Sequence, residues 1–127
     1  MKIIIILTVL LVSLVGLTGC SSTNAVYEQI SAKEAKDIMD KETGYIIIDA
    51  RTQTEYEEGH IPGAILISEY EIRERIEAEL PNKDQLILVY CRSGRRSKIA
   101  SQAMVDLGYT NVKEFGGIIN WSYEIVK

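Results

Sequence analysis

The sequence is poor in the residues that bind metals or cross-link small chains. It has two cysteines and one histidine in 127 residues, too few for a zinc site built from several cysteines, so we expect no metal site. Acidic residues outnumber basic ones, 18 to 14, which argues against a nucleic-acid-binding protein because such proteins normally have a basic excess. The composition also lacks the bias of collagen-like, disordered or disulfide-rich chains. These absences indicate an ordinary globular domain.

Charged side chains are missing from almost all of the N-terminal segment. Lys2 is the only charged residue before Glu28, and residues 3–17 are apolar apart from one threonine, one serine and one glycine. A positive residue followed by an apolar run somewhat shorter than the roughly 20 residues of a membrane span is typical of a signal peptide.

The next residues, Leu17-Thr18-Gly19-Cys20, resemble the lipobox of bacterial lipoproteins, in which a peptidase cuts before a diacylated cysteine. We therefore expect residues 1–19 to be a lipoprotein signal peptide and Cys20 to be lipidated with fatty acyl chains such as palmitate. Two or more acyl chains hold a protein stably on a membrane. The expected location is the bacterial cell envelope, lipid-anchored to a membrane and facing outside the cytoplasm. The alternative is an uncleaved signal anchor.

The rest of the chain indicates one domain. Residues 20–30 are expected to form the lipidated Cys20, a short polar tether and a first strand, and residues 31–127 the folded domain. This length can bury a core, and the sequence contains no internal repeat. No feature indicates an obligate assembly, so we expect a monomer.

Apolar strands alternate with helices along the domain. Predicted strands cover residues 26–30, 45–48, 64–67, 86–90 and 112–115, whereas predicted helices start after the capping residues Ser31 and Thr52, cover residues 69–80 and 97–107, and run from Ile118 onward. The strands at 45–48 and 86–90 are apolar on both faces, which favours a parallel sheet covered by helices on each side.

Two polar side chains directly follow these two apolar strands. Asp49 comes after the strand at 45–48, and Cys91 after the strand at 86–90. In open parallel sheets, the ligand crevice lies outside the carboxyl ends of the strands. The architecture therefore favours Cys91 as a functional residue.

The loop after Cys91 is suited to an anion. Three arginines, Arg92, Arg95 and Arg96, lie within the next five residues, and a helix is expected to begin at about Ser97. Backbone N–H groups at a helix N-terminus and nearby cations both favour a thiolate and attract an anionic substrate. Gly94 supplies a backbone conformation that a side chain would obstruct. The alternative is a solvated basic loop beside a buried cysteine.

Cysteine chemistry is further restricted if Cys20 is lipidated. Cys91 is then the only free thiol, which excludes an intrachain disulfide and a dithiol cycle. A single thiol in an exported protein indicates use, whereas the plain alternative is a small buried hydrophobe.

Three segments resemble the single-domain rhodanese family. Cys91-Arg92-Ser93-Gly94-Arg95-Arg96-Ser97 resembles its active-site loop. Asp49-Ala50-Arg51 with residues 55–64 (EYEEGHIPGA) matches the first hallmark, and residues 115–121 (FGGIINW) match the last. The three segments occur in family order and span most of residues 31–127. The resemblance implies an α/β fold with a rhodanese-like five-stranded parallel sheet and helices on both faces.

The resemblance also implies sulfur transfer through a Cys91 persulfide. The donor would be thiosulfate or a similar small anion, and the acceptor cyanide in vitro or a thiol in vivo. Substrate binding would fall to the loop residues Arg92, Ser93, Gly94, Arg95 and Arg96. We expect the loop N–H groups to stabilise the anionic persulfide. No organic cofactor is expected.

Two other functions are considered. A related cysteine-dependent phosphatase family places its phosphate-binding arginine six residues after the cysteine, whereas this chain has Ser97 there and Arg96 one residue earlier. The shorter loop favours sulfur over phosphate. A non-catalytic rhodanese-like binding module would be indicated by an absent cysteine or an uncharged loop, and the sequence has neither.

Five further residues are considered for supporting roles. Asp49, Arg51 and Ser97 are expected near the site, with Asp49 bracing the turn through Arg51 or a backbone N–H. Arg51 and Glu55, four residues apart, are expected to pair across the short helix. His60 lies in a turn of the family pattern, and we interpret it as structural because a pre-formed thiolate needs no base.

Overall fold

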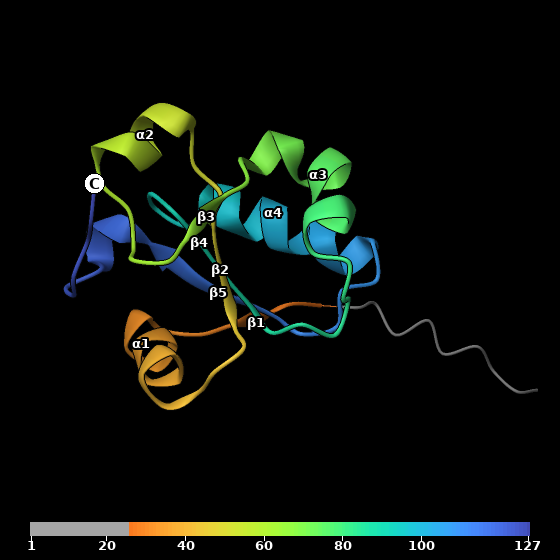
Figure 1. The fold of residues 1–127 in the computed structure, drawn as a ribbon, viewed down its shortest axis with the longest axis horizontal. Helices are drawn as coiled ribbons and strands as arrows, with labels where there is room; N and C mark the ends of the chain where they lie inside the picture. The colour runs from red at the N-terminus through yellow and green to blue at the C-terminus, as the bar shows by residue number, and fades with distance from the viewer. Residues whose placement is uncertain (1–25) are drawn as a thin grey trace, which may run out of the picture.

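The computed structural model describes residues 26–127 and shows an α/β fold around a five-stranded parallel sheet (Figure 1). The strands are β1 (Glu28–Gln29), β2 (Ile46–Asp49), β3 (Ile65–Leu66), β4 (Ile87–Cys91) and β5 (Val112–Gly117), in the order β1-β5-β4-β2-β3. The predicted fold class is confirmed. The predicted signal peptide (1–19) and Cys20 lie outside the described residues. None of the helices within residues 26–127 is long and apolar enough to cross a membrane.

The central strand β4 determines where the site lies. It is hydrogen-bonded to β2 on one side and β5 on the other, and all five of its residues are buried. Such burial on both faces requires helices above and below the sheet. Because the strands are parallel, their carboxyl ends meet at one edge, and Asp49 pairs with Tyr90 beside Cys91 there.

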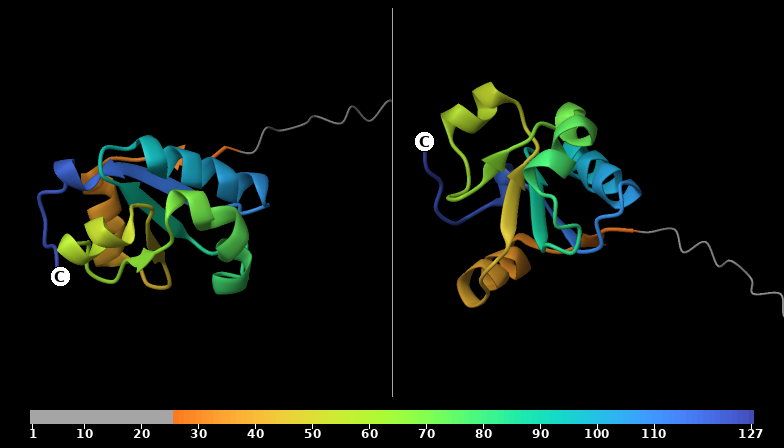
Figure 2. Two further views of the ribbon diagram at one scale, coloured as in Figure 1. Left: turned by 90° about the horizontal axis from the view of Figure 1, so that it is seen from above. Right: turned by 45° about the vertical axis from the view of Figure 1, so that its right-hand side comes forward.

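Helices cover both faces of the sheet (Figure 2). They are α1 (Ala32–Lys41), α2 (Gln53–Glu58), α3 (Ile72–Glu79) and α4 (Arg95–Asp106), with short 3-10 turns η1 (Glu69–Glu71) and η2 (Ile118–Asn120). In the right-hand view, α1 lies on one side of the sheet, and α3 and α4 lie on the other.

Each face has its own apolar core. One core contains Ile48, Val89 and Met104 and lies under α3 and α4, and the other contains Ala35, Leu88 and Phe115 and lies under α1. Alternate residues of β4 thus enter opposite cores, as the two-residue period of a strand requires.

Local capping signals predicted two helix starts well. Ser31 accepts a hydrogen bond from the Glu34 N–H at 3.0 Å, and Thr52 and Glu55 form the full reciprocal capping box of α2. The N–H groups of a first helical turn have no intrahelical partners, so these side chains stabilise the start.

The predicted helix from Ile118 onward is wrong. Only the turn η2 forms, and the chain then extends to an antiparallel bridge between His60 and Val126. The His60 N–H donates to the Val126 carbonyl at 2.8 Å, and the reverse bond is also 2.8 Å. This tertiary pairing supplies backbone partners that a helix would otherwise provide, and β-branched residues favour the extended form.

Other boundaries shift by a few residues. The predicted helix over 69–80 divides into η1 and α3, and α4 begins at Arg95 rather than at about Ser97. The first and third predicted strands, 26–30 and 64–67, shorten to two residues each. Both are edge strands of the sheet. An edge strand pairs with a neighbour on one side alone, so fewer of its residues are held in regular strand structure.

One buried hydroxyl gives a stability prediction. Within residues 26–127, the Ser101 Oγ is the buried side-chain polar atom that has no hydrogen-bond partner. Ser101→Ala removes this unpaired group and improves helix propensity in α4, so we expect the free energy of unfolding to rise by about 1 kcal/mol. The measurement is urea unfolding, with the exposed Lys98→Ala on the same helix as a control that shifts stability by less than about 0.5 kcal/mol. A less stable Ser101→Ala protein would contradict the prediction.

Candidate functional site

The Cys91 sulfur lies where β4 ends and α4 begins. Its side chain is buried, with 1% of the residue exposed, and its Sγ accepts a hydrogen bond from the Gly94 N–H at 3.0 Å. Gly94 is the N-cap of α4 and has a φ of +107°, a conformation that side chains rarely adopt. The sulfur therefore sits at the N-terminus of a twelve-residue helix, where backbone dipoles favour negative charge.

The end of β5 packs directly onto this loop. A Cβ atom built on Gly117 would lie 1.9 Å from the Arg92 carbonyl oxygen and 2.6 Å from the Ser93 Cα. Only glycine permits this approach of two backbones. The Gly-Gly pair in the last hallmark segment thus holds the loop that begins at Cys91, which joins two sequence motifs in one site.

Ser97 and Glu114 lie behind the sulfur. The Ser97 Oγ is 3.3 Å from the Cys91 Sγ and 2.7 Å from the Glu114 Oε1. Both residues are buried, at 0% and 2% exposed. The expectation that Ser97 lies at the site agrees with this geometry, whereas Glu114 was not foreseen. Its place in the strand could have indicated its burial. Glu114 lies two residues after the buried Val112 in β5, so the two side chains point to the same face of the sheet.

Asp49 and Arg51 form a buried ion pair. The Arg51 Nη2 is 2.8 Å from the Asp49 Oδ2, the Arg51 backbone N–H donates to Oδ1 at 2.9 Å, and Nη2 also donates to the Gly59 carbonyl at 2.6 Å. The Tyr90 hydroxyl donates to the Asp49 Oδ2 at 2.6 Å. Asp49 therefore braces the β2–α2 turn through Arg51 and a backbone N–H, as expected.

Tyr90 completes this network from the neighbouring strand. Burial raises the pKa of the Tyr90 phenol, and the Asp49 carboxylate adds to the rise. The phenol thus stays protonated and donates to Asp49, while its oxygen accepts from the Ile61 N–H at 3.1 Å. The network ties the segment after β2 to the strand that leads to Cys91.

The predicted pair between Arg51 and Glu55 is wrong. Glu55 instead makes a bidentate pair with Arg96 of α4, with distances of 2.6 and 2.9 Å. The hydrogen bonds from Arg96 lower the pKa of Glu55 to about 2, and the Glu55 carboxylate raises the pKa of Arg96. Glu55 does not pair with Arg51, four residues earlier, because Arg51 is bound to the buried Asp49. It pairs with Arg96 of another helix instead.

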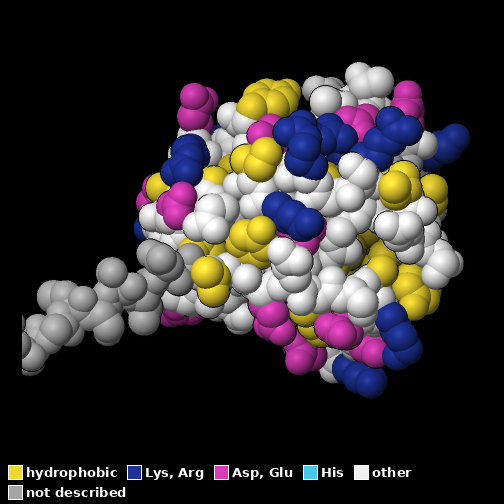
Figure 3. Space-filling model, turned by 180° about the vertical axis from the view of Figure 1, so that it is seen from behind, with side chains coloured by type: hydrophobic (Ala, Val, Ile, Leu, Met, Phe, Trp, Pro, Cys, Tyr) yellow, Lys and Arg dark blue, Asp and Glu magenta, His cyan; other side chains and the backbone are white. Residues whose placement is uncertain are grey.

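Arg92 and Arg95 remain exposed at the rim of the loop, as does Ser93. With Lys98 one turn further along α4, they place several solvated cations around the start of this helix. Basic side chains also gather in the upper part of the face shown in Figure 3. Such a positive region attracts small anions, and Arg92 and Arg95 are free to turn toward one.

His60 makes the contacts of a packing residue. Its ring stacks on Tyr56 with centroids 3.7 Å apart, and its Nδ1 lies 2.8 Å from the Tyr56 carbonyl oxygen. Its backbone forms the bridge to Val126. The ring contacts hold His60 against α2, and the backbone bridge joins this turn to the C-terminal segment.

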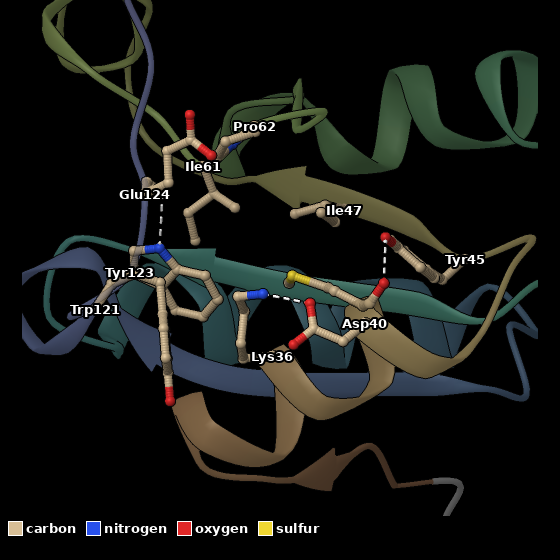
Figure 4. Close-up of a pocket in the computed structure, with 10 residues that line it drawn as sticks. Lys36, Asp40, Tyr45, Ile47, Ile61, Pro62, Trp121, Tyr123 and Glu124 are labelled. Atoms are coloured by element: carbon tan, nitrogen blue, oxygen red, sulfur yellow. Dashed lines mark hydrogen bonds and ion pairs between the residues drawn. The ribbon is translucent and has the colours of Figure 1, made fainter.

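A separate cavity of about 190 Å³ lies on the α1 face (Figure 4). Lys36, Asp40, Trp121 and Tyr123 are among its lining residues, and neither Cys91 nor its loop contributes to it. Among residues 26–127, no group of three or more His, Cys, Asp or Glu side chains could hold a metal ion. The polar groups that gather around a nucleophile are those of the β4–α4 loop.

Residues 31–124 match the family model of the rhodanese-like domain, and the chain belongs to this family. It is 39% identical over 71 residues to the thiosulfate sulfurtransferase PspE of Escherichia coli (strain K12), covering 56% of this chain and 68% of that protein. It is 35% identical over 97 residues to the thiosulfate sulfurtransferase GlpE of Coxiella burnetii, covering 76% of this chain and 88% of that protein.

A solved structure of a rhodanese with anions from E. coli is also similar to this chain in sequence and fold. It is 36% identical to this chain with a TM-score of 0.62, covering 65% of this chain and 98% of that one. Together these relatives support a sulfurtransferase of the rhodanese type.

The pair between Glu55 and Arg96 gives a pH prediction. A carboxylate whose pKa falls from 4.5 to about 2 on folding stabilises the fold above pH 4.5, and this contribution is lost as the pH falls through about 2. We expect Glu55→Gln to lower the free energy of unfolding by about 1 kcal/mol at pH 6, because the ion pair with Arg96 is lost. The effect is no larger because about a quarter of each side chain is exposed to solvent, which screens the pair.

The difference from the unsubstituted protein should shrink as the pH is lowered toward 2, measured by urea unfolding at several pH values. Glu58→Gln, on the same helix and exposed, is the control that leaves the pH profile unchanged. A difference that stays constant down to pH 2 would show that Glu55 does not titrate as described.

Proposed function

We propose that this protein transfers a sulfane sulfur from thiosulfate or a similar small anion to a thiophilic acceptor through a persulfide on Cys91. The observation that supports this most is the position of the Cys91 Sγ at the N-terminus of α4, with a hydrogen bond of 3.0 Å from the Gly94 N–H. Membership of the rhodanese-like family agrees with it.

In the first half of the reaction, the Cys91 thiolate attacks the outer sulfur of thiosulfate. The sulfur–sulfur bond of thiosulfate breaks, its electron pair leaves with sulfite, and a new bond joins the Sγ to the transferred sulfur. The exposed Arg92 and Arg95 attract and orient the dianion, and Ser93 lies between them in the loop.

In the second half, an acceptor attacks the outer sulfur of the persulfide, and Cys91 leaves as the thiolate. The acceptor is cyanide in vitro and a thiol in vivo. The Gly94 N–H and the α4 N-terminus stabilise the anionic sulfur in both halves. Arg96 acts mainly by holding Glu55 and contributes its positive charge from there. The reaction uses no cofactor.

The test is transfer of sulfur from thiosulfate to cyanide by the purified protein and by Cys91→Ser. We expect the substitution to abolish turnover, because a serine hydroxyl is a far weaker nucleophile than a thiolate at neutral pH. Intact mass after incubation with thiosulfate should show one added sulfur atom on the unsubstituted protein and none on Cys91→Ser.

A persulfide without turnover would keep Cys91 but point to another acceptor. If neither a persulfide nor turnover is detected, the thiosulfate proposal is overturned. Hydrolysis of an aryl phosphate would then favour the phosphatase alternative. Thermal unfolding of both proteins shows whether the substitution preserves the fold.

We further propose that the chain is a lipoprotein of the bacterial cell envelope, anchored through acyl chains on Cys20 and facing outside the cytoplasm. The tetrad Leu17-Thr18-Gly19-Cys20 after an apolar run supports this. Cys20→Ala should abolish incorporation of radiolabelled palmitate in a bacterial host and release the protein from the membrane fraction, or leave it unprocessed. Equal labelling of Cys20→Ala and the unsubstituted chain would contradict the anchor, and Cys91→Ser is the control that keeps the label.

A further inference from the structure

We propose that Glu114 serves as the proton acceptor for the Cys91 thiol, acting through the Ser97 hydroxyl. The proposal rests on one juxtaposition of three buried groups, Cys91, Ser97 and Glu114, which come from β4, α4 and β5. For its part in turnover it depends on the sulfurtransferase function proposed above, whereas its test measures the thiol directly.

The three groups form a continuous chain of hydrogen bonds. The Cys91 thiol donates to the Ser97 Oγ at 3.3 Å, and the Ser97 hydroxyl donates to the Glu114 Oε1 at 2.7 Å. The three residues are 1%, 0% and 2% exposed. A proton that leaves the sulfur along this path therefore passes between protein groups rather than directly into water.

The direction of the Ser97 proton follows from its contacts. A hydroxyl has one proton, and the Ser97 Oγ also lies 3.0 Å from the Gly94 carbonyl oxygen and 3.5 Å from that of Gly116. The contact with Glu114 is the shortest, and a carboxylate is a stronger acceptor than a carbonyl. Ser97 therefore donates toward Glu114 and accepts from the thiol.

Glu114 has no paired cation in the described part of the chain. Its Oε1 accepts the Ser97 hydroxyl and the Gly116 N–H, the latter at 2.7 Å. As a carboxylate it is the strongest acceptor that the Ser97 hydroxyl contacts. Glu114 thus has the position to take the proton of the thiol.

The elements that pack against β5 carry the other charged groups of this region. They are Arg92 of the loop, Arg95, Arg96, Lys98 and Asp106 of α4, Glu28 of β1 and Lys113 of β5 itself. Arg96 is paired with Glu55, and Lys113 with Glu28. The helix α1 packs on the opposite face, against the side of the sheet that holds Phe115.

The proton balance is simple. In the first half-reaction, the Sγ–H bond breaks, Ser97 Oγ takes this proton, and the proton that Ser97 carried moves to the Glu114 Oε1. The thiolate then attacks the donor. When the acceptor removes the outer sulfur, Cys91 leaves as a thiolate, and the same two protons move back. Glu114 is a positioning residue here, because it acts on the sulfur only through Ser97.

The test is the rate at which iodoacetamide alkylates Cys91 between pH 5 and 10, followed on the peptide that contains Cys91 after reaction of the full chain. If thiol and carboxyl share one proton, the thiolate fraction is constant over the range in which the pair holds that proton, so the rate shows a plateau. In Glu114→Gln the plateau should vanish, and the rate should fall about tenfold for each pH unit below the thiol midpoint.

The two proteins should converge at high pH, where hydroxide removes the thiol proton without the relay. A purely structural role for Glu114 would leave the shape of the profile unchanged. A permanently ionised Glu114 would have the opposite effect, because removing a neighbouring negative charge favours the thiolate and speeds alkylation at neutral pH. Either result would overturn the proposal.

Ser97→Ala is a second variant that tests the relay in case Glu114→Gln disturbs the fold. It removes the hydrogen bonds that join the thiol to the carboxyl while leaving the carboxyl in place, so the plateau rate should be lower than in the unsubstituted protein. A plateau of unchanged rate in Ser97→Ala also overturns the relay. Glu74→Gln, an exposed carboxyl on α3, is the charge-matched control that leaves the profile as it is.

Failure of this inference can be told from failure of the proposed function. A plateau lost in Glu114→Gln and lowered in Ser97→Ala, together with no transfer of sulfur by the unsubstituted protein, would retain the relay and reject the sulfurtransferase. Normal sulfur transfer by the unsubstituted protein, with alkylation profiles unchanged in both variants, would retain the sulfurtransferase and reject the relay. Thermal unfolding and far-UV circular dichroism verify that each variant is folded.

Discussion

The hydrogen bond from the Gly94 N–H to the Cys91 Sγ depends on a sharp turn from a buried strand into a helix, and most of the site depends on that turn. β4 is buried on both faces and cannot shift along the sheet without exposing one core. Gly94 allows the turn, and Gly117 lets the end of β5 press against it. The sulfur is thereby held by backbone geometry, which is a rigid way to position a nucleophile.

Two buried networks flank this turn and have different chemistry. On one side, Asp49, Arg51 and Tyr90 form a fully paired network that fixes the β2–α2 segment. On the other side, Ser97 and Glu114 form a network without a cation. A paired network resists change because breaking it leaves an uncompensated charge, whereas an unpaired carboxyl can accept a proton without losing an ion-pair partner. The first network is suited to support and the second to chemistry.

Much of the fold could be predicted from patterns that act locally. Continuous apolar strands indicated the parallel sheet, and the capping residues Ser31 and Thr52 marked helix starts. The end of the chain could not be predicted in this way, because Val126 pairs with His60, far away in sequence. The same limit explains Glu55, which pairs with Arg96, 41 residues further along the chain, rather than with Arg51. Cys91 was apparent because strand, glycine and arginines coincide, whereas Glu114 was a single acidic residue in a strand.

The direction of the strands also determines how an anchored molecule would face its surroundings. The described chain begins at Val26 and enters β1 at Glu28, at the amino edge of a sheet in which every strand runs the same way, whereas Cys91 lies at the carboxyl edge. In Figure 1 the start of the coloured chain accordingly lies on the side opposite the turn between β4 and α4. The first described residue and the reactive sulfur thus lie at opposite edges of the sheet. A structure attached through the N-terminal strand would therefore join the domain at the edge remote from Cys91, which leaves the sulfur open to small anions that diffuse in water.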